Sequence, residues 1–173
     1  MLEIEVKCPV EDIGHVEERL ISQGARFDKE VSQEDRYLGH PCRDFASTDE
    51  GLRLRREGDR VVLYYKGPKL DKLTKTREEL STPVPDPRSM YLILQRLGFT
   101  PVATVEKVRR TYHLGPVEVS LDTVSGLGGF VELEVQDLHL DVGRPMLEEA
   151  MKALGLERTE RRSYLELLLE KRS

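Results

Sequence analysis

Hydrophobic and polar residues alternate strictly in the segment 2–7, which reads Leu-Glu-Ile-Glu-Val-Lys. Because successive side chains of a strand point to opposite faces, this pattern predicts a strand with one apolar face and one charged face. The same alternation recurs along the chain. It predicts further strands at residues 36–38, 51–57, 61–66, 75–82, 105–113, 117–124 and 129–135.

Apolar residues recur at helical spacing in the segments 10–24, 87–98 and 144–155, and each segment ends at a glycine. This punctuation predicts three amphipathic helices. The leucine-rich segment 164–170 fits a helix or a strand equally well. Gly58-Asp59 and Gly115-Pro116 separate neighbouring strand patterns, and such turn residues predict antiparallel hairpins.

Composition limits the class of protein. With 173 residues, of which 38% are hydrophobic, we expect one well-buried domain. A net charge of -5 excludes the overall basicity of a sequence-independent nucleic-acid binder. The sequence has no membrane-length apolar run and no signal-peptide pattern at its start, so we expect a cytoplasmic protein. Cys8 and Cys42 are not expected to form a disulfide in that compartment, and the cysteines and histidines lack zinc-ligand spacing.

The polar faces of the predicted strands are unusually rich in charge. Ordinary exposed strands carry mixtures of Thr, Ser and long polar residues, whereas these faces carry sparse clusters of like charge. The residues on these faces are Glu3, Glu5 and Lys7; Arg53 and Arg55; Lys66; Lys75, Arg77 and Glu79; Lys107 and Arg109; Glu118, Ser120 and Asp122; and Glu132 and Glu134.

For any single strand, the simpler interpretation is a sheet face turned to water, with helices covering the apolar face. Repetition of the pattern weakens this interpretation. Arg53 repels Arg55, and Glu132 repels Glu134, across about 7 Å, so a group of opposite charge is expected to bridge each pair. A dry interior is excluded because each unpaired buried ion costs several kcal/mol. We therefore predict a wet groove or tunnel.

The two signs of charge suit two partners. Carboxylates are hard oxygen ligands for Mg²⁺ or Mn²⁺, and basic side chains donate to phosphate oxygens. Together they predict a metal-dependent site for a triphosphate and the chemistry of phosphoryl or nucleotidyl transfer. The predicted metal ligands are Glu3, Glu5, Asp122, Glu132 and Glu134, and the predicted phosphate-binding residues are Lys7, Arg53, Arg55, Lys66, Arg77, Lys107 and Arg109.

Three other segments have simpler explanations. The glycine-rich segment 126–129 lacks the spacing of a phosphate loop and fits a hairpin turn or bulge. Lys69 and Lys72 belong either to this site or to a solvated loop. The basic residues Arg158, Arg161 and Arg162 lie among glutamates in a mixed surface run, which could still reach the mouth of the site.

The ordered set of charged segments resembles the CYTH proteins, also called triphosphate tunnel metalloenzymes. The match covers essentially the whole chain, as a single domain over residues 1–173. The segments that carry it are the E-x-E-x-K strand of Glu3, Glu5 and Lys7, then Asp35-Arg36-Tyr37-Leu38, Leu52-Arg53-Leu54-Arg55, Tyr65-Lys66-Gly67-Pro68-Lys69, Arg77-Glu78-Glu79-Leu80, Lys107 with Arg109, and Glu132-Leu133-Glu134.

Within the family, the chain is most similar to the class IV adenylyl cyclase-like branch. This similarity lies in Leu97-Gly98-Phe99, Val105-Glu106-Lys107-Val108-Arg109, the segment 127–134 and Ser163-Tyr164-Leu165-Glu166. The resemblance implies an α+β fold, with an eight-stranded antiparallel β-barrel that forms a tunnel flanked by helices. It also implies that glutamates hold the metal and that arginines and lysines hold the triphosphate.

The resemblance leaves three activities open. Cyclase-like members convert ATP to cyclic AMP and pyrophosphate, triphosphatase members hydrolyse the terminal phosphate, and a non-catalytic member would bind nucleotide or polyphosphate without turnover. Lys66 is the candidate for positioning or activating the nucleophile. We expect a small-molecule triphosphate as partner, no nucleic acid and no membrane, and a homodimer is compatible with the resemblance.

Overall fold

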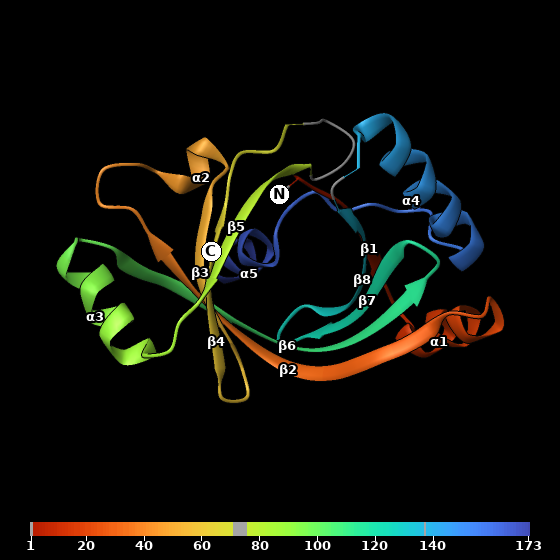
Figure 1. Cartoon of the computed structure of the whole chain (residues 1–173), viewed down its shortest axis with the longest axis horizontal. Helices are drawn as coiled ribbons and strands as arrows, with labels where there is room; N and C mark the ends of the chain where they lie inside the picture. Colours follow the sequence, from red (N-terminus) through yellow and green to blue (C-terminus); the bar gives the residue numbers. More distant parts are fainter. Residues whose placement is uncertain (1, 71–75, 137) are drawn as a thin grey trace.

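Strands of the chain form a closed antiparallel barrel, shown in Figure 1. A computed structural model describes residues 2–70, 76–136 and 138–173. In this part of the chain the strand order around the barrel is β1-β5-β4-β3-β2-β6-β7-β8, which confirms the predicted α+β architecture. The strands are β1 (Leu2–Val10), β2 (Arg26–Gly39), β3 (Gly51–Glu57), β4 (Arg60–Lys66), β5 (Arg77–Pro83), β6 (Thr100–Leu114), β7 (Val117–Val124) and β8 (Gly128–Gln136).

Tight turns join neighbouring strands, and β1 closes the barrel. Gly58 and Gly115, with φ of 57° and 58°, lie in the β3–β4 and β6–β7 turns, as the sequence predicts. Positive φ strains residues with a Cβ, which explains glycine at both positions. Pairing of β1 with both β5 and β8 closes the barrel. Closure leaves no free sheet edge and turns the charged strand face into an enclosed surface.

Helices cover the outside of the barrel and bury its apolar face. They are α1 (Ile13–Ser22), α2 (Phe45–Thr48), α3 (Pro87–Arg96), α4 (Leu140–Leu154) and α5 (Tyr164–Arg172). In Figure 1, α1 and α4 lie on one side of the barrel and α3 on the other. Residues of α1 and α4 pack with the outward residues of β1, β7 and β8, and α3 contributes Leu94 to a second cluster with β3. The main hydrophobic core therefore lies outside the tunnel.

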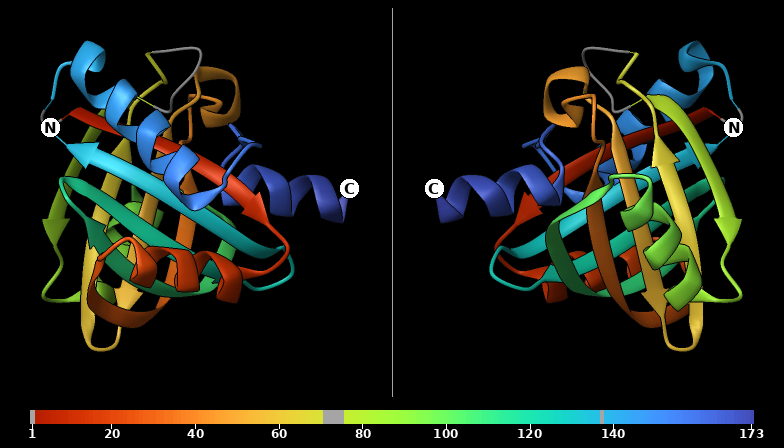
Figure 2. Two further views of the ribbon diagram at one scale, coloured as in Figure 1. Left: turned by 90° about the vertical axis from the view of Figure 1, so that its right-hand side faces the viewer. Right: turned by 90° about the vertical axis from the view of Figure 1, so that its left-hand side faces the viewer.

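The last helix, α5, starts at the barrel and runs away from it. It is seen nearly end-on within the ring of strands in Figure 1 and projects to one side of the barrel in both views of Figure 2. Its Tyr164 and Leu168 pack on Val105, Val124 and Phe130, which come from β6, β7 and β8. These contacts anchor the first half of α5 to the barrel.

Capping residues explain where the last two helices begin. Ser163 accepts a hydrogen bond from the backbone N–H of Glu166, and the Glu166 side chain accepts one from the Ser163 N–H. This capping box starts α5 and settles the choice between helix and strand. Helix α4 begins at Leu140, four positions before the predicted start. No sequence signal marks this start because the N-cap residue, His139, makes no side-chain capping hydrogen bond.

Several sequence predictions need correction or fall outside the described residues. Strand β2 is much longer than the predicted 36–38. The prediction missed its first half because the residues there are mostly exposed and show no alternation of apolar and polar positions. Lys72 and Lys75, predicted in a basic loop and on a charged strand face respectively, lie outside the described residues. Cys8 is buried, Cys42 is exposed, and no disulfide joins them. Among the described helices, none has the length and apolar character needed to cross a membrane.

Candidate active site

The inner faces of the strands surround a cavity of about 780 Å³. All the residues predicted for the site line this cavity except Asp122, which is fully buried in the wall behind it. The positions alternate along each strand, so their side chains share the inner face. Residues of α2, of the segment 39–51 and of α5 also line the cavity.

Three carboxylates form a compact cluster on one wall. Glu3 and Glu5 come from β1, and Glu134 comes from β8, where it lies directly opposite Glu5 in the register. One oxygen from each lies within 4.8 Å of the others. Burial, together with the neighbouring carboxylate of Glu3, raises the pKa of Glu134 to about 9. Burial also raises the pKa of Glu3. A set of hard oxygen ligands this close suits Mg²⁺ or Mn²⁺.

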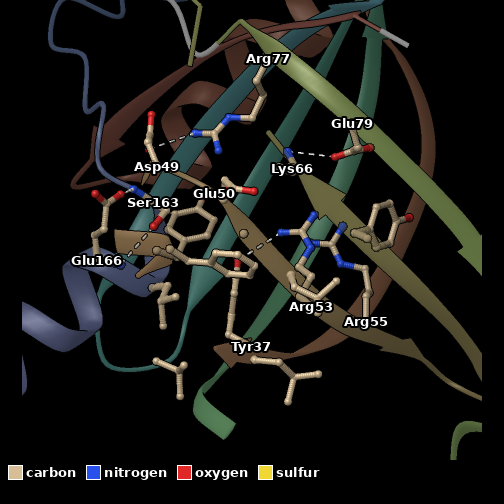
Figure 3. A pocket seen from close by; sticks show the side chains of 18 of the residues that line it. Tyr37, Asp49, Glu50, Arg53, Arg55, Lys66, Arg77, Glu79, Ser163 and Glu166 are labelled. Carbon is tan, nitrogen blue, oxygen red and sulfur yellow. Dashed lines mark hydrogen bonds and ion pairs between the residues drawn. The ribbon is translucent and has the colours of Figure 1, made fainter. Parts of the chain in front are cut away.

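Lys66, the last residue of β4, directs its ammonium into this cluster. Its Nζ lies 2.8 and 3.0 Å from the two carboxylate oxygens of Glu3, and 3.1 Å from a carboxylate oxygen of Glu79 on β5. Figure 3 shows Lys66 directed toward Glu79. Burial alone would lower the pKa of Lys66, but Glu3 and Glu5 outweigh it and hold the pKa above its usual value. Lys66 therefore carries a positive charge in this structure.

Arg53 and Arg55 on β3 are bridged by one carboxylate. Two guanidinium nitrogens of Arg55, Nε and Nη2, each donate to an oxygen of Asp35 at 2.7 Å, and Arg53 lies 3.5 Å from the same carboxylate. Burial would raise the pKa of Asp35, but the charges of Arg53 and Arg55 hold it well below its usual value. Arg53 also donates to the hydroxyl of Tyr37 (Figure 3). The group of opposite charge that the sequence required between these arginines is thus Asp35.

Lys107 and Arg109 on β6 gather around the buried Asp122. Arg109 donates to both oxygens of this carboxylate at 2.7 and 2.6 Å, and Lys107 donates at 3.1 Å. The hydroxyl of Tyr164 on α5 donates to it at 2.8 Å. Arg109 also donates to Glu132. In this structure Asp122 holds basic side chains in place, and Arg109 links it to the carboxylate of Glu132. Its predicted role as a metal ligand stays a prediction.

Lys66 and Lys107, two of the lysines that line the cavity, differ in their proton affinity. Burial and the charge of Arg109 lower the pKa of Lys107 to about 8, although Asp122 opposes the shift. The Lys107 ammonium also lies 4.8 Å from the centre of the Tyr164 ring. Lys107 is therefore much closer to losing its proton near neutral pH than Lys66 is.

Lys7 and Arg77 line the same cavity but contact backbone carbonyls. The Lys7 ammonium donates to the backbone carbonyl of Arg162 and lies 4.3 Å from the centre of the Tyr164 ring. Arg77 donates to the carbonyl of Gly67 at 3.3 Å and points toward Asp49 (Figure 3). In this structure, Lys7 ties the C-terminal segment to the barrel, and Arg77 pairs with residues near the end of β4.

Sequence reasoning missed three residues that shape the site. Asp35 and Tyr37 lie on the inner face of β2, and Tyr164 reaches the wall from α5. Had β2 been predicted at its full length, the alternation of Gln33, Asp35 and Tyr37 would have indicated an inner face. Tyr164 had no such signal, since its position depends on how α5 docks against the barrel end.

Part of the cavity lining is apolar. Phe45 on α2, Val102 on β6 and Leu169 on α5 belong to it, and Val102 and Leu169 are exposed. The charged and the apolar parts of the lining suit a ligand with a polyanionic end and an organic end.

These observations define the class of protein: a closed antiparallel barrel whose inner face carries carboxylates and basic side chains. The chain belongs to the CYTH domain family, whose model matches residues 1–164. The family assignment confirms the resemblance seen in the sequence.

Similar proteins support the same assignment. A Methanocaldococcus jannaschii protein provisionally named an adenylate cyclase is 41% identical over 96% of this chain and 98% of its own length. The adenylate cyclase CyaB of Aeromonas hydrophila is 27% identical over 94% of this chain and 86% of its length. A solved structure from Pyrococcus horikoshii OT3 is 41% identical, with a TM-score of 0.88 over 98% of this chain and 99% of that chain.

Proposed function

We propose that this protein is a divalent-metal-dependent enzyme that converts ATP to cyclic AMP and pyrophosphate in its tunnel. The observation that carries the proposal is the facing of two walls: a carboxylate cluster on β1 and β8, and arginines fixed on β3 and β6. The names of the relatives in Methanocaldococcus jannaschii and Aeromonas hydrophila support the choice of cyclisation.

Glu3, Glu5 and Glu134 would hold the metal. The spacing of their oxygens fits a hard divalent cation, which usually binds through one or two carboxylates together with substrate phosphates. A bound Mg²⁺ or Mn²⁺ would neutralise charge on the phosphates and favour departure of pyrophosphate.

Arg53, Arg55, Lys107 and Arg109 would bind the phosphates. Support comes from Arg53, whose buried Nε has no hydrogen-bond acceptor among the described residues. A buried donor without a partner is costly, and a phosphate oxygen would satisfy it. Because their carboxylate partners already fix the arginines, the guanidinium groups are oriented before the substrate arrives.

The apolar part of the lining would receive the nucleoside. In the proposed reaction the ribose 3′-oxygen forms a bond to the α-phosphorus, the bond from that phosphorus to the bridging oxygen breaks to release pyrophosphate, and the 3′-hydroxyl proton passes to solvent water. Glu3 and Glu5 keep Lys66 positively charged in the metal-free protein, which favours a role in positioning the nucleophile over one in activating it.

The experiment is an analysis of products. The protein is incubated with ATP and Mg²⁺ or Mn²⁺, and the nucleotides are separated by ion-exchange chromatography. Cyclic AMP with stoichiometric pyrophosphate is expected. Orthophosphate from ATP, inorganic triphosphate or thiamine triphosphate would replace the proposal with hydrolysis. Binding of ATP without any product would replace it with a binding function.

Two variants make the assay specific for the site. Glu3→Gln should abolish metal-dependent turnover. Glu149→Gln, at an exposed position on α4, is the matched control and should react as the wild type does. Equal activity of both variants would show that the carboxylate cluster is not the metal site.

A further inference from the structure

The Lys66 ammonium contacts two of the three carboxylates that would bind a metal ion. It lies at hydrogen-bonding distance from both oxygens of Glu3 and 3.8 Å from an oxygen of Glu5. Those carboxylates are two of the three whose oxygens approach within 4.8 Å of one another. In the metal-free protein, this lysine is therefore the counterion of the cluster.

The Lys66 ammonium and a divalent cation compete for these oxygens. Lys66 donates to both oxygens of Glu3, and a bound Mg²⁺ would lie about 2.1 Å from the oxygens that it takes as ligands. Two cations that close repel each other strongly where water is scarce. Metal binding to Glu3 and Glu5 thus favours displacement of the Lys66 side chain.

The geometry offers Lys66 a second position. In the β4–β5 register Lys66 is directly opposite Glu79, so its side chain can swing away from Glu3 while it stays near the Glu79 carboxylate. The inner face of β3, next to β4, carries Arg53 and Arg55. Figure 3 shows Lys66 and these arginines in the same cavity. A displaced ammonium would lie beside the predicted phosphate-binding arginines.

We propose that Lys66 is an exchangeable counterion, which fills the carboxylate cluster when no metal is bound and turns to the triphosphate when the metal displaces it. The inference rests on the proposed function of the tunnel and adds an order to it. Metal binding creates one more phosphate-binding cation, so metal and triphosphate strengthen each other's binding, and this coupling is reciprocal.

Calorimetric titration with Mn²⁺ tests this directly, without turnover. The proteins are wild type, Lys66→Met and the control Lys69→Met, whose lysine pairs with Asp49 outside the cluster. Loss of the competing cation should tighten Mn²⁺ binding to Lys66→Met by about tenfold or more, since one charge is removed from within hydrogen-bonding distance of the ligand oxygens. Lys69→Met should bind Mn²⁺ as the wild type does.

The second measurement is the coupling. The affinity for an ATP analogue with a methylene group between the α and β phosphorus atoms is measured with and without Mn²⁺. The gain produced by Mn²⁺ should be smaller in Lys66→Met than in the wild type. If Lys66→Met is unstable, its melting temperature should still rise more steeply with added Mn²⁺ than that of the wild type, because only the folded state binds the ion at this cluster.

The outcomes separate this inference from the proposed function. Unchanged or weaker Mn²⁺ binding by Lys66→Met, with the wild type binding Mn²⁺ normally, would overturn the counterion role alone. Failure of the wild type to bind Mn²⁺ at all would overturn both. Tighter Mn²⁺ binding with loss of coupling supports the exchange, whichever products the enzyme forms.

Discussion

Removal of the Asp35 carboxylate should destabilise the barrel more than most single substitutions. Asp35 is 1% exposed and faces both Arg53 and Arg55. In Asp35→Ala the two guanidinium groups would lie next to each other in the wall with no counter-charge between them. The cost comes mainly from this uncompensated charge, because the wild-type pair is partly offset by its own desolvation.

The structure gives a magnitude. Breaking a buried pair by removing one partner costs about 3–5 kcal/mol. The two charge-assisted hydrogen bonds from Arg55, at about 1.5–3 kcal/mol each, give a similar sum. For a domain of this size, about 2–4 °C are lost per kcal/mol, so we expect the melting temperature to fall by roughly 6–20 °C.

Urea denaturation followed by circular dichroism measures the loss at pH 7. Asp28→Ala, on the exposed part of the same strand, is the control and should change the free energy of unfolding by no more than about 0.5 kcal/mol. The folded pKa of Asp35 lies below its usual 3.8, so its contribution is complete above that pH and is lost as the pH falls below it. A loss of less than about 1 kcal/mol at pH 7 would refute the assignment of Asp35 as the shared counter-charge.

Three further predictions concern the metal cluster, the phosphate wall and the C-terminal segment. Combined Glu3→Gln and Glu5→Gln substitution should abolish Mn²⁺ binding in calorimetry and leave the circular dichroism spectrum nearly unchanged; retained Mn²⁺ binding would place the metal elsewhere. Arg109→Ala should weaken binding of the methylene ATP analogue by about 1.5–3 kcal/mol; an unchanged dissociation constant would show that Arg109 does not contact phosphate. A hydrogen bond from Arg162 lowers the pKa of Glu160 to about 2. At pH values above 4.5, Glu160→Gln should therefore cause a small decrease in the melting temperature, and this decrease should shrink and disappear as the pH falls to 2 and below. A difference that persists at pH 2 would contradict this pairing.

Local signals in the sequence were sufficient to predict most of the strands. Alternation located the strands wherever one face packs against the outer helices, as in β1, β7 and β8. It failed for the first half of β2, where both faces are exposed and nothing forces the residues to alternate. The short helix α2 was not predicted either, because a single turn offers no periodicity. Closure of the barrel came from the family resemblance, since pairing of β1 with β5 and β8 is a long-range property.

Alternation was sufficient to predict which residues line the cavity, but not how they pair. The charges led to a prediction of the ligand class, which stays a prediction. Which carboxylate serves which cation depends on the strand order, and this places Asp35 against Arg55 and Asp122 against Arg109. Like charges two residues apart predicted that a bridging group exists, without its identity. The predicted roles of Lys7 and Asp122 as ligands remain predictions.

The basic side chains of the tunnel differ in how firmly they are held, and this difference separates their roles. Arg55 and Arg109 each form a two-point pair with a carboxylate, which fixes the plane of the guanidinium before any ligand arrives. The Lys66 ammonium instead contacts glutamates that a metal would claim, on a flexible stem with no fixed plane. A fixed cradle lowers the ordering cost of binding a triphosphate, whereas a mobile cation can follow the charge that develops on it. The tunnel therefore needs both kinds of cation, and exchange of Arg for Lys at either kind of position should not be conservative.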